Sequence, residues 1–219
     1  MTEEAVAKIE NSFLEYRAVF RNPIFGGWDP HGALGPSLFA AFRPWNIGLE
    51  NVSWKTLPSK ANEIEMQFSL FNFRAVFSVG LGSASLAVTD PKWSERDLIV
   101  QIASAGLGAV QSAAKPEIDR HVVALSLHAR LLNKTLREVT EPFVNVRPAG
   151  SPTSPVRACG FSAYREDGFW VVDLSAVVPD GLFAKVVRFF PPEVPLSAMP
   201  PALDADETAL WETLKLRFE

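Results

Sequence analysis

The stretch 63–70 alternates polar and apolar side chains without a break, and no other pattern in the sequence constrains the fold as strongly. Its apolar residues are Ile64, Met66, Phe68 and Leu70, each preceded by a polar residue. Successive side chains of a β-strand point to opposite faces, so this period of two predicts a strand with one buried and one wet face. Strands of this kind belong to antiparallel sheets.

Further strands follow from phase changes and turn signals. The apolar phase shifts after Leu70 and again after Gly82, which predicts either a long, bent strand or a hairpin turning near Asn72–Arg74, ending at Asp90-Pro91. Three more strands are expected at 158–164, 169–174 and 182–190, the first two joined by the hairpin signal Glu166-Asp167-Gly168. The segment 38–56 reads as two short edge strands, because Pro44 and Gly48 interrupt it.

Three segments space their apolar residues by three and four, which predicts amphipathic helices. The first segment is 2–20. The second begins with Ser94 as its N-cap and ends at Lys115-Pro116. The third begins near Asp204, after an extended proline-rich segment at 191–201. The apolar stripe of the third comprises Leu210, Leu214 and Phe218. Two glycines inside the second helix, Gly106 and Gly108, indicate close packing against a sheet, because glycine lowers helix stability.

The segment 117–140 fits two patterns. Alternation through Leu131 predicts a strand followed by a short helix to about Glu141, whereas a stripe from Ile118 to Val139 fits one helix. The β-branched pair Val122-Val123 favours the strand.

The order of these elements predicts an α+β fold, a mostly antiparallel sheet packed with helices. Its 219 residues fit a single domain over 1–219. Two similar strand-plus-helix halves are compatible with the same order, although no residue-level repeat establishes a duplication.

Composition bounds the compartment and the partners. Cys159 is the single cysteine, which excludes an internal disulfide, and no signal peptide is recognisable, so a cytoplasmic location is expected. The net charge of −4 argues against nucleic-acid binding, which draws on clustered Lys and Arg. No apolar stretch is long enough to span a membrane. Basic residues dominate 115–165 and acidic residues dominate 166–219.

Asp119, His121 and His128 form the nearest approach to a catalytic cluster, because a carboxylate can orient an imidazole that acts as a general base. On a strand the two histidines face opposite sides, whereas on a helix they share one face. The alternative is a hydrogen-bonded histidine in or beside the core. No catalytic residue, metal ligand or cofactor is therefore assigned. Cys159 reads as the buried start of a strand, and the Gly-Leu-Gly pairs match no complete nucleotide fingerprint.

Aromatic residues outside the clean helical and strand stripes are the candidates for binding. They are Phe25, Trp28, Trp45, Trp93 and Trp170, together with Trp54, Phe71 and Phe73. Large rings of this kind line apolar clefts or interfaces, or they complete a core under long loops. Phe25, Trp28 and His31 fall in an expected loop at 21–36.

Two function classes follow from these observations. The first is a noncatalytic binding or assembly protein that presents an apolar groove or sheet edge to a protein partner or to itself. The second is a small-molecule enzyme with an apolar pocket and a histidine general base, in which Asp119 orients the histidine. The absence of a complete catalytic motif favours the first class.

Overall fold

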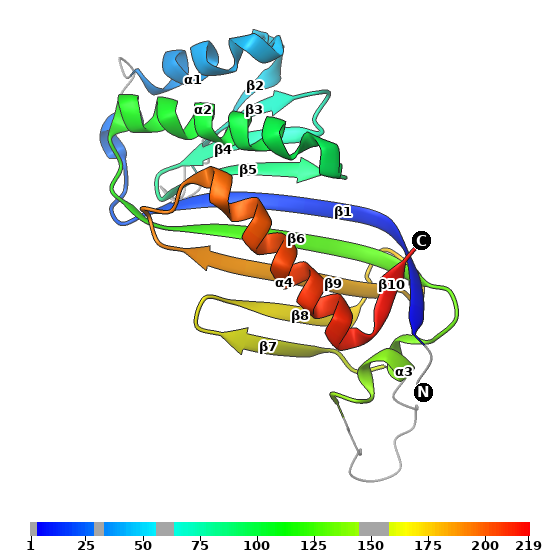
Figure 1. Ribbon diagram of the computed structural model, residues 1–219. Coiled ribbons are helices and arrows are strands. Elements are labelled where there is room, and N and C mark those ends of the chain that lie inside the picture. Colours follow the sequence, from blue (N-terminus) through cyan, green and yellow to red (C-terminus); the bar gives the residue numbers. More distant parts are fainter. Residues whose placement is uncertain (1–3, 29–32, 56–63, 145–157) are drawn as a thin grey trace. The chain divides into compact units, whose positions relative to one another are not determined.

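The computed structural model describes residues 4–28, 33–55, 64–144 and 158–219. In this part of the chain, ten mostly antiparallel strands form one sheet accompanied by four α-helices, which confirms the predicted α+β class (Figure 1). The strands are β1 (Ala5–Phe20), β2 (Val52–Lys55), β3 (Glu65–Leu70), β4 (Ala75–Gly80), β5 (Ser83–Thr89), β6 (Ile118–Leu131), β7 (Phe161–Arg165), β8 (Gly168–Leu174), β9 (Leu182–Phe190) and β10 (Leu216–Phe218). The helices are α1 (Leu34–Phe42), α2 (Arg96–Ala114), α3 (Leu136–Thr140) and α4 (Met199–Leu214).

The hydrogen-bonded order of the strands is β2-β3-β4-β5-β1-β6-β9-β8-β7, with β10 paired to β1. The chain divides into two compact units, which are described separately. Unit 1 comprises Met1–Phe13, Ala124–Arg188 and Pro201–Glu219, and unit 2 comprises Leu14–Val123 and Phe189–Pro200. Strands β1, β6 and β9 and helix α4 belong in part to each. The single domain over 1–219 stays a prediction.

In unit 2, one face of the sheet forms a core beneath helices α1 and α2. A row of partners crosses strands β2 to β5 on this face: Val52, Phe68, Phe77 and Leu86. Phe42 of α1 packs its ring against Phe68 at 5.5 Å and against Phe77 at 5.1 Å between ring centroids. Within the described residues 64–70, the predicted alternation is confirmed by the burial of Met66, Phe68 and Leu70.

Gly106 explains how α2 approaches this core. A Cβ atom at Gly106 would lie 2.4 Å from Cε2 of Phe77 and 2.8 Å from Cζ of Phe42. The predicted close packing is therefore confirmed for Gly106. It is wrong for Gly108, where a Cβ atom would meet nothing within 4 Å.

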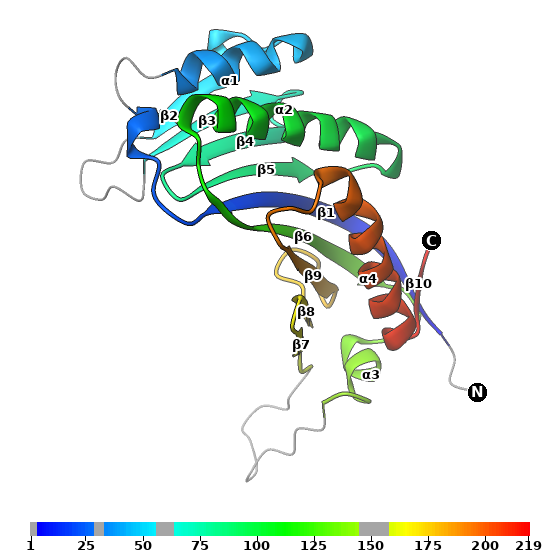
Figure 2. The same cartoon turned by 60° about the vertical axis from the view of Figure 1, so that its left-hand side comes forward.

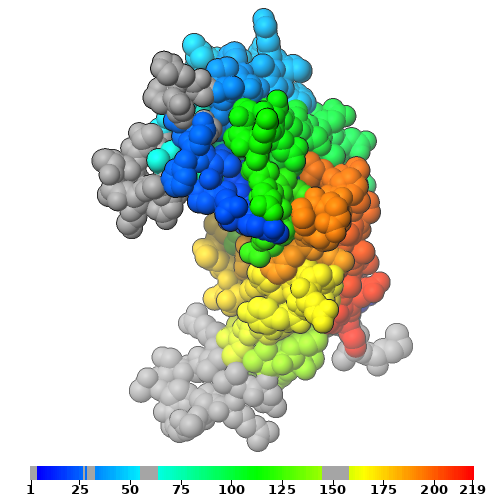
Figure 3. All heavy atoms as spheres, turned by 90° about the vertical axis from the view of Figure 1, so that its left-hand side faces the viewer, coloured from blue at the N-terminus to red at the C-terminus, as the bar shows by residue number. Residues whose placement is uncertain are grey.

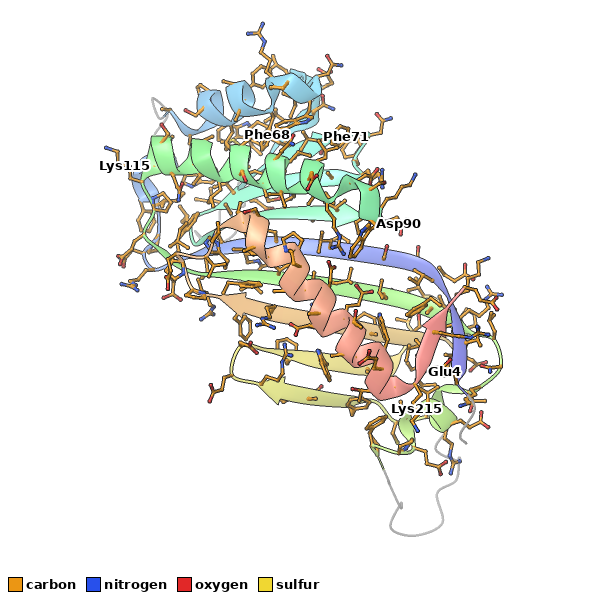
Figure 4. The ribbon with its side chains drawn as sticks, viewed as in Figure 1. Glu4, Phe68, Phe71, Asp90, Lys115 and Lys215 are labelled. Carbon is orange, nitrogen blue, oxygen red and sulfur yellow. The ribbon has the colours of Figure 1, made fainter. Side chains whose placement is uncertain are left out.

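The turn between β3 and β4 holds three consecutive residues with left-handed backbone, Phe71, Asn72 and Phe73 (φ 51°, 55° and 67°). The predicted turn near Asn72–Arg74 is thus confirmed. Phe71 lies at the same end of unit 2 as Asp90, and Lys115 lies at the opposite end, where α2 stops (Figure 4).

In unit 1, helix α4 lies on one face of the strands (Figures 1 and 2). Val172 and Ala184 are partners on this face, and both are buried. The predicted strands at 158–164, 169–174 and 182–190 correspond to β7, β8 and β9, and the predicted hairpin joins β7 to β8. β7 begins only at Phe161, so Cys159 precedes the strand and is half-buried, which corrects the expectation of a buried strand start.

The helix predicted at the amino terminus is wrong, because residues 5–20 form strand β1. Tyr16, Ala18 and Phe20 are buried in alternation, whereas Ile9 and Phe13, which a helical stripe would bury, are 40% and 41% exposed. Apolar spacing alone fits both structures over this segment. Pairing with strands that are distant in the sequence decides between them.

The segment 38–56 was expected to form two edge strands, but its first part lies in α1 and only β2 is a strand. Leu34, Leu38 and Phe42 recur at intervals of four and are buried, so they form the inner face of the helix. Gly35 and Pro36, expected in a loop, lie in the first turn of α1, where proline is tolerated. His31 lies outside the described residues.

The bounds of the two long helices also differ from the prediction. Ser94 does not cap α2, because a 3₁₀ turn, η5 (Trp93–Glu95), precedes the helix. The carboxylate of Glu95 accepts the backbone N–H of Lys92 and pairs with Arg74. Helix α4 begins at Met199 rather than near Asp204, and Phe218 lies in β10 instead of on the helix.

For 117–140, the prediction of a strand followed by a short helix is confirmed by β6 and α3. The side chain of Thr135 caps α3 by accepting the backbone N–H of Glu138.

The order β1, α1, β2–β5, α2 is followed along the chain by β6, α3, β7–β9, α4, which agrees with two similar strand-plus-helix halves. Prolines and small polar residues over 143–155 predict a loop, and most of that stretch lies outside the described residues.

Candidate binding surface

His121 belongs to the core of unit 2. It is 3% exposed, and its Nδ1 accepts a hydrogen bond from the hydroxyl of Tyr16 across 2.9 Å. Nε2 donates to the carbonyl oxygen of Pro192 across 3.3 Å, which requires the neutral Nε2–H tautomer because a carbonyl only accepts. Burial lowers the pKa of His121, with the hydrogen bond to Pro192 offsetting part of the shift, and burial raises the pKa of Tyr16. Both ring nitrogens are occupied, so His121 acts as a structural residue.

Because the pKa of folded His121 lies below its ordinary value, the unfolded chain binds more protons near pH 6. The stabilisation is complete above about pH 6.5 and is lost as pH falls below that value, through the lower pKa of the folded state. We expect chemical denaturation to show a smaller loss of unfolding free energy between about pH 6.5 and 5 in His121→Gln than in the native protein. Glutamine can keep both hydrogen bonds without titrating. An unchanged pH dependence would show that His121 titrates normally in the fold.

Asp119 does not orient either histidine. Its carboxylate lies 3.8 Å from Nε of Arg21 and 3.6 Å from a guanidinium nitrogen of Arg120. His121 has its own partners, as described above, and His128 belongs to unit 1. Asp119, His121 and His128 thus each have different partners.

His128 pairs with Ser175 in unit 1. The Oγ of Ser175 lies 2.9 Å from Nδ1 of His128 and accepts the backbone N–H groups of Val177 and Val178. With both acceptor positions filled, the Ser175 hydroxyl proton is directed to Nδ1, and the proton of neutral His128 resides on Nε2. Burial lowers the pKa of His128. The ring also packs against Phe183 at 4.9 Å.

The five predicted binding residues are divided between the two units. Trp170 belongs to unit 1, and the other four belong to unit 2. Phe25 and Trp93 are exposed, whereas Trp28, Trp45 and Trp170 are half-buried. Trp28 meets the ring of Trp54 edge to face at 6.0 Å, and Trp45 packs on Phe42. Trp170 faces α4, and the guanidinium of Arg165 lies over its ring.

The second face of the unit 1 sheet carries the feature that sequence reasoning missed. Tyr164, Phe169 and Val187 are partners across β7, β8 and β9, and Val171 and Phe183 point to the same side. We call these five residues the apolar face; Ser162, Asp173 and Lys185 point to the same side, and Val187 is only 4% exposed. They alternate with residues that contact α4, such as Arg165 and Arg188, so they lie on the opposite side of the sheet. No helix in the described part of the chain covers this side.

The apolar face contrasts with the corresponding side of unit 2. There, the partners across β2, β3, β4 and β5 are Ser53, Gln67, Ser78 and Ser85. A sheet that is covered on one side ordinarily shows such polar residues on the other. Strands β8 and β9 instead place apolar residues on both sides, and Tyr164 is 79% exposed. The consecutive apolar residues Phe169–Val172 and Val186-Val187 carried this signal in the sequence.

The covered side of the same sheet is held by an ion-pair network. The carboxylate of Asp206 in α4 accepts two hydrogen bonds from Arg165, both 2.8 Å, and two from Arg188, both 2.9 Å. Asp167 pairs with both arginines from the hairpin turn. Burial would raise the pKa of Asp206, but the hydrogen bonds from Arg165 and Arg188 outweigh it, and the pKa lies below its ordinary value. The network anchors α4 on this side of the sheet.

Within residues 4–28, 33–55, 64–144 and 158–219, no group of His, Cys, Asp and Glu side chains is arranged to hold a metal ion. No helix in the described segments combines the length and apolar character needed to cross a membrane. Comparison of the sequence with protein-family models gives no match, and comparison with curated proteins gives none either.

Proposed function

We propose that this protein is a noncatalytic binding or assembly protein that presents the apolar face of unit 1 to a protein partner or to a second copy of itself. The observation that carries the proposal is that β8 and β9 place apolar residues on both sides of the sheet, whereas α4 lies on one side. Tyr164 is exposed and Phe169, Val171 and Phe183 are half-buried, so part of these apolar side chains remains in water. Apolar surface left in water on a folded protein marks an interaction site, because burying it gains free energy.

The geometry gives less support to an enzyme with a histidine general base. His128 is the histidine beside the apolar face, since it contacts Phe183. A general base must offer an unprotonated nitrogen to its substrate. Nδ1 of His128 is already bonded to Ser175, and the remaining nitrogen carries the proton. His128 is therefore arranged to donate a hydrogen bond to a ligand.

Substitution at the centre of the apolar face tests the proposal. Val171 is the partner of Lys185, so Val171→Glu places a carboxylate opposite an ammonium group and keeps the sheet paired. We expect the native protein to bind a fluorescent dye specific for apolar surface, and Val171→Glu to lose that binding.

The matched control is Ser85→Glu, on the polar side of the unit 2 sheet, which should behave as the native protein does. A native protein that does not bind the dye would overturn the proposal. Equal effects of Val171→Glu and Ser85→Glu would also overturn it, because the apolar face would then have no special role.

A further inference from the structure

Strand β7 forms an edge of the unit 1 sheet. It pairs with β8 over its whole length, from Phe161 to Arg165, and no strand in the described part of the chain pairs with its other side. An edge strand presents backbone N–H and C=O groups that can accept a further strand. Figure 3 shows the β7–β8 hairpin, in yellow, reaching the surface.

The sequence of β7 lacks the features with which proteins block such edges. Its residues, Phe-Ser-Ala-Tyr-Arg, include no proline and no lysine. Lysine, proline and bulges are the usual devices against edge-to-edge pairing. Phe161 and Tyr164 are instead residue types that favour strands.

The charge of β7 is compensated within its own unit. Arg165 is the single charged residue of the strand, and it gives two hydrogen bonds to Asp206 and lies 3.4 Å from Asp167. Two β7 strands can therefore approach without opposing uncompensated charges, which would destabilise a paired sheet.

The apolar face reaches the edge at this strand. Tyr164 is the outermost member of the row that continues through Phe169 to Val187. At the other end of the strand order, β2 carries Ser53 as the outermost member of a polar row. Pairing at β7 would thus extend an apolar surface, whereas pairing at β2 would extend a polar one.

We infer that β7 pairs antiparallel with β7 of a second copy of this chain, which joins the two apolar faces into one surface. This inference rests on the proposed function and adds a second copy that enlarges the apolar face. An antiparallel strand is its own complement under a twofold axis, so a single contact satisfies both edges and closes the assembly at two copies. In a register centred on Ala163, Ser162 lies opposite Tyr164 of the second copy.

Two proline variants of the full chain test the pairing. Neighbouring residues of an edge strand direct their N–H groups alternately inward and outward, so Ser162→Pro and Ala163→Pro differ in which group they remove. We expect the native protein to sediment as a dimer. The variant that lacks an outward N–H should sediment as a monomer, with a thermal unfolding midpoint close to the native one. The other variant should lose thermal stability because it interrupts the pairing with β8.

Hydrogen exchange of the native protein gives a second readout that needs no substitution. The outward amides of β7 should exchange about tenfold more slowly at high than at low protein concentration, and the amides of β2 should not change. A native protein that remains monomeric, or a dimer with unprotected β7 amides, overturns the inference. A monomer that still binds the apolar dye would refute the pairing while leaving the proposed function intact. A dimer lost in Val171→Glu but kept in both proline variants would place the second copy on the apolar face instead.

Discussion

Asp206→Asn is expected to lower the free energy of unfolding by about 3 kcal/mol, because it leaves two arginines without their buried counter-charge. Asp206 is 4% exposed and accepts hydrogen bonds from both Arg165 and Arg188. An asparagine side chain has the same shape but no charge, and its amide N–H₂ cannot accept from a guanidinium. For a chain of this size, the loss corresponds to a fall of about 6–12 °C in the thermal midpoint, measurable by calorimetry.

Glu212→Gln is the matched control, since Glu212 is an exposed acid on the same helix. It should change stability by less than about 0.5 kcal/mol. Because the pKa of folded Asp206 is below its ordinary value, its contribution is present above about pH 4 and is lost as pH falls further. Equal stabilities of Asp206→Asn and Glu212→Gln at neutral pH would show that the network does not anchor α4.

Gly106→Ala is expected to destabilise the protein by about 1–3 kcal/mol, although alanine is the better helix former. The added methyl group would lie 2.4 Å from the ring of Phe77 and 2.8 Å from that of Phe42. Both rings are fully buried and pack on each other, so neither can move without disturbing the core. Urea denaturation measures the effect.

Gly108→Ala is the internal control, two residues further along the same helix. Its methyl group would meet nothing within 4 Å, so helix propensity alone should raise stability by up to about 1 kcal/mol. The two alanine variants should therefore shift stability in opposite directions. Stabilisation by both would mean that α2 does not pack closely on Phe77.

The candidate site was predicted from the sequence only in part. The binding class rested on aromatic residues, yet the five residues assigned to it, such as Phe25 and Trp170, lie in different units. The apolar face comprises different residues, among them Tyr164 and Phe169. The sequence pattern of this face is a strand with apolar residues on both sides. That pattern is the same whether the second side of the strand contacts protein or water. Whether a helix lies on that side is a property of the tertiary structure.

The histidines show the same limit. Residues 118–131 form a strand, in which successive side chains point to opposite sides. His121 and His128 are an odd number of positions apart, so they lie on opposite sides of this strand. The partners of each, Tyr16 with Pro192 and Ser175 with Phe183, come from segments that no local pattern connects to them.

Local chemistry by itself determined most of the strands, the hairpin turns and the α+β class, because side-chain alternation and turn residues act over a few positions. The tertiary structure decided the state of residues 5–20, where apolar spacing fits a helix but pairing with distant strands forms β1. The tertiary structure also explains the glycine at position 168. A Cβ atom there would lie 2.1 Å from the backbone oxygen of Val187, a neighbour that the sequence near Gly168 does not contain.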